Sequence, residues 1–126
     1  MTEKRSILIV EDEPLIAMML EDFIMSLGHD VRESCDSVSG ALAAVEQGGF
    51  HLAILDVNLK GEHVWPVAWA LKAKGIPFVL ASGGHVEPPP GEFRDAALIE
   101  KPYTIDRVTP IIDAALASAP SSTSSQ

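Results

Sequence analysis

The chain has little positive charge, few aromatic side chains and a single cysteine. Its 126 residues include nine Lys and Arg against 18 Asp and Glu, which gives a formal net charge of -9. This deficit of cations argues against nucleic acid as the direct partner, because phosphate backbones are bound by basic surfaces. Since Cys35 has no second cysteine to pair with, an intramolecular disulfide is excluded. We interpret Cys35 as a small buried hydrophobic side chain.

Long hydrophobic runs are also missing from the sequence. The polar residues 1–6 precede a run of four apolar residues, which is too short for a signal peptide or a membrane span. We therefore expect a cytoplasmic protein that makes no contact with a membrane. With 126 residues and a hydrophobic content of 47%, the chain suits one domain with its own core.

Short apolar runs alternate with segments of helical periodicity, which is typical of βα units around a parallel sheet. The predicted strands are residues 6–10, 30–34, 52–56, 78–81 and 97–100. The predicted helices run from Pro14 to about Gly28, from Ser37 to about Gly48, over 62–74, and from Thr104 or Asp106 to 117. The fold class is therefore α/β, with one sheet and helices on both of its faces.

Three details of this assignment can be checked against a structure. Apolar residues recur at helical spacing in the first helix, so we expect its buried side to carry Leu15, Met18, Met19, Phe23 and Ile24. Pro66 lies inside 62–74, so that helix either starts near Pro66 or is kinked there. The histidines share no metal-binding spacing, and we interpret all four as surface or loop residues: His29, His51, His63 and His85.

Polar side chains follow the predicted strands at the points where the strands end. In chain order these side chains are Glu11, Asp12, Asp56, Ser82 and Lys101. Ligands of open parallel sheets bind in the crevice outside the carboxyl ends of the strands, so we expect the five to converge. Three acids, one hydroxyl and one lysine suit a site for a metal ion and a phosphoryl group.

The chemistry of such a site assigns a role to each of these groups. Mg²⁺ prefers oxygen ligands, which Glu11, Asp12 and Asp56 offer together with the main-chain carbonyl of Asn58. A phosphoryl group transferred to a carboxylate needs its charge neutralised, and the metal supplies this. The amine of Lys101 can pair with the phosphoryl oxygens, and a hydroxyl such as that of Ser82 can donate a hydrogen bond to them.

Four blocks of sequence resemble the receiver domain of two-component response regulators. They are ILIVEDEP at 7–14, LAILD at 52–56, AS at 81–82 and KP at 101–102, and the resemblance covers residues 6–117. It implies a flavodoxin-like (CheY-like), doubly wound, five-stranded parallel sheet of order 2-1-3-4-5. It also implies that Asp56 is the phosphoacceptor, Glu11 and Asp12 the metal acids, Ser82 the switch hydroxyl and Lys101 the phosphate-sensing lysine.

The chain departs from the usual receiver pattern in three places. Leu98 stands where receivers usually carry an aromatic residue, and Ser82 replaces the usual threonine. The Gly- and Pro-rich residues 83–91 indicate a fourth helix that is short or replaced by a loop. The run 77–84 resembles a divergent receiver class called FAT GUY, with Leu80 and Ser82 in place of Phe and Thr. That class includes stand-alone regulators linked to the alphaproteobacterial general stress response.

The sequence thus predicts a receiver domain over 1–117 and a disordered, Ser-rich tail over 118–126. A sensor histidine kinase or phosphotransfer protein would phosphorylate Asp56, and the output would be binding to a downstream protein. Because the chain stops after the last helix, we expect a monomeric, single-domain regulator. It would be a switch that catalyses only its own phosphorylation and dephosphorylation, and no enzyme otherwise.

Four other functions were weighed against this one. A phosphate sink, or a scaffold for a kinase that works without phosphorylation, would use the same fold. An aspartate-nucleophile phosphatase would need a second Asp at position 58, where the sequence has Asn58. A flavodoxin-like cofactor binder would need a phosphate-cradling loop after the first strand, where residues 11–13 are all acidic.

Overall fold

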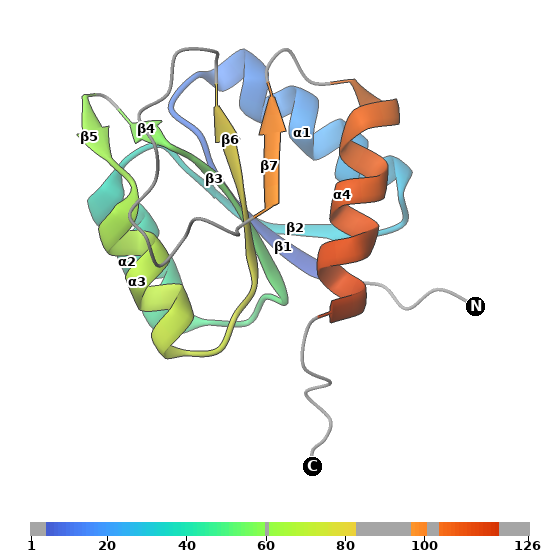
Figure 1. The fold of residues 1–126 in the computed structure, drawn as a ribbon. Helices are drawn as coiled ribbons and strands as arrows, with labels where there is room; N and C mark the ends of the chain where they lie inside the picture. Colours follow the sequence, from blue (N-terminus) through green and yellow to red (C-terminus); the bar gives the residue numbers. More distant parts are fainter. Residues whose placement is uncertain (1–4, 60, 83–96, 101–103, 119–126) are drawn as a thin grey trace.

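A computed structural model describes residues 5–59, 61–82, 97–100 and 104–118 of the chain. Figure 1 shows a central sheet with helices on both sides. The strands are β1 (Ser6–Val10), β2 (Asp30–Cys35), β3 (Leu52–Asp56), β4 (Asn58–Leu59), β5 (Glu62–His63), β6 (Phe78–Ser82) and β7 (Ala97–Glu100). The helices are α1 (Pro14–Ser26), α2 (Val38–Gln47), α3 (Trp65–Ala73) and α4 (Ile105–Ser118).

Five of the strands form one parallel sheet in the order β2-β1-β3-β6-β7. This is the predicted order 2-1-3-4-5 of a flavodoxin-like, doubly wound sheet, so the predicted fold class is confirmed. The order changes direction between β1 and β3, which makes the carboxyl ends of these two strands the switch point of the sheet. Ligands of such folds bind at this point.

Two hydrophobic clusters hold the sheet between its helices. The central strand β3 is buried over all five residues, as expected for a strand covered on both faces. One cluster joins alternate strand residues to α1 and α4, and the other joins the remaining strand residues to α2 and α3. None of the helices within the described residues combines the length and the hydropathy needed to cross a bilayer.

The helices begin where local chemistry predicts. Ser37 caps α2, because its Oγ accepts a hydrogen bond from the main-chain N–H of Gly40 at 3.1 Å. Thr104, rather than Asp106, precedes α4, and its Oγ1 accepts from the main-chain N–H of Arg107 at 3.3 Å. Pro66 lies in the first turn of α3, so the helix starts beside this proline.

The prediction for the buried side of α1 is wrong at two positions. The residues buried against the sheet are Ala17, Leu20 and Ile24, whereas Leu15 is 78% exposed and Met18 is 58% exposed. The buried stripe has the spacing i, i+3, i+7, and its small Ala17 lets the first turn approach the sheet closely. The other three predicted positions are borne out: Ile24 is buried, and Met19 and Phe23 are partly buried against the same cluster.

The structure also contains a hairpin that the sequence did not indicate. Residues 62–64 are predicted as part of a helix. Residues 62 and 63 instead form β5, which pairs with β4 in a two-stranded antiparallel sheet, and Val64 continues this pairing through its hydrogen bond to Val57. Gly61 has a φ of +84°, which glycine adopts without the steric cost that other residues meet. The hairpin connects Asp56 to α3 and is a separate small sheet beside the main one in Figure 1.

His29 lies in the loop between α1 and β2, which agrees with its prediction as a surface or loop residue, but it is buried at 4% exposed rather than on the surface. Its Nδ1 accepts a hydrogen bond from the main-chain N–H of Arg5 at 3.1 Å. The half-buried His51 does the same for the next residue, because its Nδ1 accepts from the N–H of Ser6 at 3.1 Å. His29 and His51 each precede a strand that pairs with β1, so two imidazoles hold the start of this strand.

The environment of His29 makes folding stability depend on pH. Burial lowers the pKa of His29 below its ordinary value of 6.5, and the charge of Arg5 lowers it further. The charges of Asp113 and Asp30 raise the pKa, but they offset only part of this lowering. The imidazole is therefore protonated more readily in the unfolded chain than in the folded one. Its contribution to stability is complete above about pH 6.5 and is lost as the pH falls towards the lowered pKa.

We expect the free energy of unfolding to fall as the pH is lowered from 7.5 to 5, and to fall less in His29→Asn. Asparagine places an oxygen acceptor near the position of Nδ1 but does not titrate. Denaturant unfolding at a series of pH values measures this. The control His63→Asn removes an exposed imidazole and should keep the wild-type slope, whereas equal slopes in His29→Asn and wild type would contradict the assignment.

Candidate functional site

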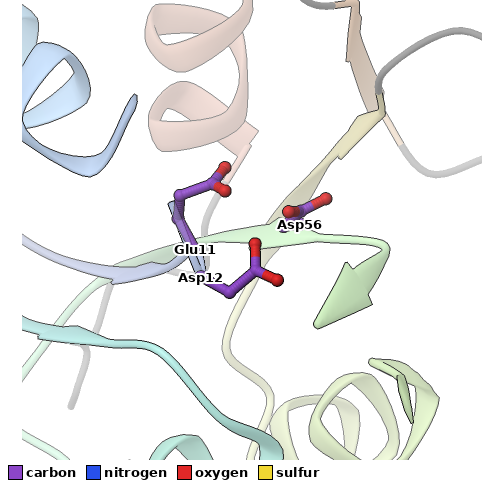
Figure 2. A group of neighbouring side chains, drawn as sticks. All are labelled: Glu11, Asp12 and Asp56. Atoms are coloured by element: carbon purple, nitrogen blue, oxygen red, sulfur yellow. The ribbon is translucent and has the colours of Figure 1, made fainter. Parts of the chain in front are cut away.

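Three carboxylates meet at the carboxyl ends of β1 and β3. Glu11 and Asp12 directly follow β1, and Asp56 is the last residue of β3. Each offers one oxygen, and these oxygens all lie within 4.8 Å of one another (Figure 2). Glu11 and Asp56 are buried, at 2% and 6% exposed, and Asp12 is half-buried. The convergence expected from the sequence is therefore present for all three acids.

The main chain fixes where these acids lie. In the parallel ladder, Val10 pairs with Leu55, so the next residue of each strand, Glu11 and Asp56, is brought to the same edge. The N–H of Glu11 donates to the carbonyl oxygen of Cys35 at 2.9 Å, which continues the ladder towards β2. The Glu11 carboxylate is held as well, because its Oε2 accepts from the N–H of Glu13 at 3.1 Å.

The donor set of this cluster fits a hard divalent cation. All three groups are carboxylates, which are the ligands that Mg²⁺ and Ca²⁺ take in proteins. Negative charges this close repel one another, so a cation between them is favoured by their combined charge. A phosphate anion alone would be repelled for the same reason. The residues present therefore fit Mg²⁺, which receiver domains bind in an acidic pocket.

The cysteine near this cluster takes no part in metal or nucleophilic chemistry. Cys35 is 6% exposed, which confirms its interpretation as a buried hydrophobic side chain. Burial, together with the charges of Glu33 and Asp36, raises the pKa of its thiol to about 11. Since the thiolate is the reactive and metal-binding form, a thiol protonated at neutral pH is inert.

A pocket opens beside two of the acids, between α1 and the end of β2. Its volume is about 280 Å³, and it is lined by Glu11, Asp12, Pro14, Ala17, Met18, Glu21, Ser34, Cys35 and Asp36. The sequence analysis missed this pocket because none of its five candidate site residues follows the strand predicted at 30–34. The pocket is also lined by two further acids, Glu21 and Asp36, so the negative charge of the cluster continues from Glu11 and Asp12 towards α1 and the end of β2.

For the other predicted site residues, the structure gives the main-chain positions of Ser82 and Asn58 only. In the ladder between β3 and β6, Asp56 pairs with Ala81, so the main chain of Ser82 lies one residue further along at the same edge. Asn58 begins β4, two residues after Asp56. Lys101 and the Gly- and Pro-rich segment that follows Ser82 lie outside the described residues, and their predicted roles stay predictions.

Comparisons with known proteins agree with this fold. Residues 7–87 match the family model described as the response regulator receiver domain. Solution structures of SdrG from Sphingomonas melonis Fr1, and of its BeF3-activated conformation, are 52% and 51% identical to this chain. They cover 92% of this chain and 99% of their own, with TM-scores of 0.82 and 0.78.

Two further relatives carry receiver domains of more distant sequence. The receiver domain of PhyR, a stress response regulator, from Erythrobacter litoralis is 30% identical, covers 94% of both chains and gives a TM-score of 0.82. The nitrogen assimilation regulatory protein NtrX from Azorhizobium caulinodans is 32% identical over 117 residues. That match spans 87% of this chain but only 26% of NtrX.

The matched span includes both strand ends that carry the three carboxylates, and the fold matches that of SdrG with a TM-score of 0.82. Family membership therefore has support from both sequence and fold. This chain belongs to the response regulator receiver domains of two-component systems.

Proposed function

We propose that this protein is a single-domain response regulator whose phosphoacceptor is Asp56. A phosphohistidine on a sensor histidine kinase or a phosphotransfer protein donates the phosphoryl group. The phosphorylated form then signals by binding a downstream protein. The observation that carries the proposal is the meeting of Glu11, Asp12 and Asp56 within 4.8 Å at the switch point of the sheet.

The transfer is a displacement at phosphorus. An oxygen of the Asp56 carboxylate attacks, a phosphorus–oxygen bond forms, and the phosphorus–nitrogen bond to the donor's imidazole breaks. The imidazole leaves with the electron pair of that bond and takes up a proton. The product is an acyl phosphate on Asp56, so the donor loses one phosphoryl group and this protein gains it.

The residues around Asp56 bind the metal ion and contact the phosphoryl group. Glu11 and Asp12 hold Mg²⁺, with the main-chain carbonyl of Asn58 as a further oxygen ligand. The ion supplies the charge neutralisation that lets an anionic phosphoryl group approach an anionic carboxylate. The amine of Lys101 pairs with the phosphoryl oxygens, and the Ser82 hydroxyl donates a hydrogen bond to them. The low exposure of Asp56 limits the access of water to the acyl phosphate.

The relatives support two parts of this proposal: the role in stress signalling, and the assignment as a regulator with a single receiver domain. PhyR is a stress response regulator, and SdrG is matched over 99% of its solved chain. SdrG also adopts a BeF3-activated conformation, and beryllofluoride mimics a phosphoryl group on a carboxylate. We extend the same activation to Asp56. Because Leu98 replaces the usual aromatic residue of β7, the output does not depend on a ring at that position.

We expect a small phosphodonor such as acetyl phosphate, with Mg²⁺, to add one phosphoryl group to the wild-type protein and none to Asp56→Asn. Intact-mass spectrometry measures this directly. The matched control Asp22→Asn removes an exposed acid of α1 and should be phosphorylated like wild type. Phosphorylation of Asp56→Asn, or none of the wild type, would exclude Asp56 as the acceptor.

We expect Asp12→Asn to raise the melting temperature in EDTA, because it removes one of three mutually repelling charges. Two like charges about 4 Å apart cost about 1 kcal/mol in water, which corresponds to a few degrees for a domain of this size. Mg²⁺ should raise the melting temperature of the wild type by mass action and that of Asp12→Asn much less. Calorimetry in EDTA and in Mg²⁺ checks both, and an equal response to Mg²⁺ would contradict the assignment.

A further inference from the structure

The segment between Asp56 and α3 is built as a hairpin with a fixed register. Asn58 pairs with His63 and Leu59 pairs with Glu62 across the antiparallel strands β4 and β5. The N–H of Val64 donates to the carbonyl oxygen of Val57 at 3.0 Å. The pair Val57–Val64, which is next to the pair Asn58–His63, is therefore hydrogen-bonded. In antiparallel strands, hydrogen-bonded and non-hydrogen-bonded pairs alternate. Asn58 and His63 are therefore a non-hydrogen-bonded pair.

This register leaves the main-chain carbonyl of Asn58 unused by the hairpin. In a non-hydrogen-bonded pair, the N–H and C=O groups of both residues point away from the partner strand. The carbonyl of Asn58 thus points away from β5, two residues after Asp56. A register shifted by one residue would turn this carbonyl towards β5 and engage it there.

Buried side chains hold the hairpin in this register. Leu59 is 0% exposed, and it lies in the same hydrophobic cluster as Val57 and Val64, which are 8% and 0% exposed. Successive side chains of a strand point to opposite faces, so a shift of one residue would carry Leu59 out of the core. Burial of a large aliphatic side chain stabilises a fold, so the shifted register, which would expose Leu59, is disfavoured.

The hairpin is also fixed at both ends. The N–H of Val57 donates to the carbonyl oxygen of Ala81 at 3.0 Å, which ties the start of the hairpin to β6. At the other end, the N–H groups of Val67 and Ala68 donate to the carbonyl oxygen of Val64, at 2.8 and 3.2 Å, so the hairpin runs directly into α3. Leu59 is the buried anchor between these two attachments.

We propose that Leu59 is a positioning residue for the cation site: its burial locks the hairpin register that presents the Asn58 carbonyl to the ion held by Glu11, Asp12 and Asp56. The inference rests on the proposed function, because it assigns a role towards the same ion. Leu59 touches neither the ion nor the phosphoryl group. It acts through the main chain of the residue before it.

The test compares Leu59→Ala with Leu71→Ala, which deletes the same atoms from a leucine that is equally buried in the same cluster but belongs to α3. Both variants should be less stable than wild type, so affinities are measured at a temperature where NMR shows each to be folded. Leu59→Ala should bind Mg²⁺ about tenfold more weakly, as is typical when groups that orient metal ligands are altered. Leu71→Ala should bind Mg²⁺ like wild type, and Leu59→Met should retain most of the affinity.

Two NMR signals report the register directly. A contact between the Hα atoms of Asn58 and His63 marks the non-hydrogen-bonded pair and needs no metal. The carbonyl carbon of Asn58 should shift on addition of Mg²⁺ in the wild type and in Leu71→Ala. In Leu59→Ala, both the Hα contact and the carbonyl shift should weaken.

The outcomes separate this inference from the proposed function. Equal Mg²⁺ affinities for Leu59→Ala and Leu71→Ala, or no Hα contact between Asn58 and His63 in the wild type, would remove the positioning role alone. If the wild type binds no Mg²⁺, or binds it as well after Asp12→Asn, the cation site and the positioning role fall together.

Discussion

The parallel pairing of β1 with β3 is the constraint on which the rest of the site depends. Once Val10 lies beside Leu55, the acids that follow have to share one edge of the sheet in spite of their like charges. The repulsion between two such charges about 4 Å apart is about 1 kcal/mol in water and about 4 kcal/mol at the effective dielectric constant near a protein surface. Burial of a single large aliphatic side chain contributes about 1.5–3 kcal/mol, and β1 and β3 bury several. The stabilisation from the buried core therefore outweighs the repulsion between the carboxylates. The acids stay close together at a place where a bound cation would reduce their repulsion.

The two ends of β1 are held by opposite kinds of group. At its carboxyl end, Glu11 and Asp12 gather negative charge with Asp56. At its amino end, the imidazoles of His29 and His51 accept hydrogen bonds from the N–H groups of successive residues. The strand between these two ends is almost completely buried.

Local signals predicted the parts of the structure that local chemistry decides. Apolar runs gave the strands, and the cap Ser37 gave the start of α2. The predictions were wrong where tertiary contacts decide. Four of the first six residues of α1 are large and apolar, so periodicity could not select its buried side. The strands of the hairpin have two residues each, which is too short for any period. His29 lies in a loop, as predicted, but the sequence carries no signal for its burial or for its hydrogen bond to a residue 24 positions earlier.

Both tryptophans of the chain, Trp65 and Trp69, belong to α3. Trp65 is half-buried at the first position of this helix, and Trp69 is 45% exposed one turn later with the Lys72 amine 5.8 Å from its ring centre. The hairpin joins Asp56 to this helix through Val64. We therefore expect the natural fluorescence of the protein to respond to a displacement of the residues that follow Asp56, with no label required.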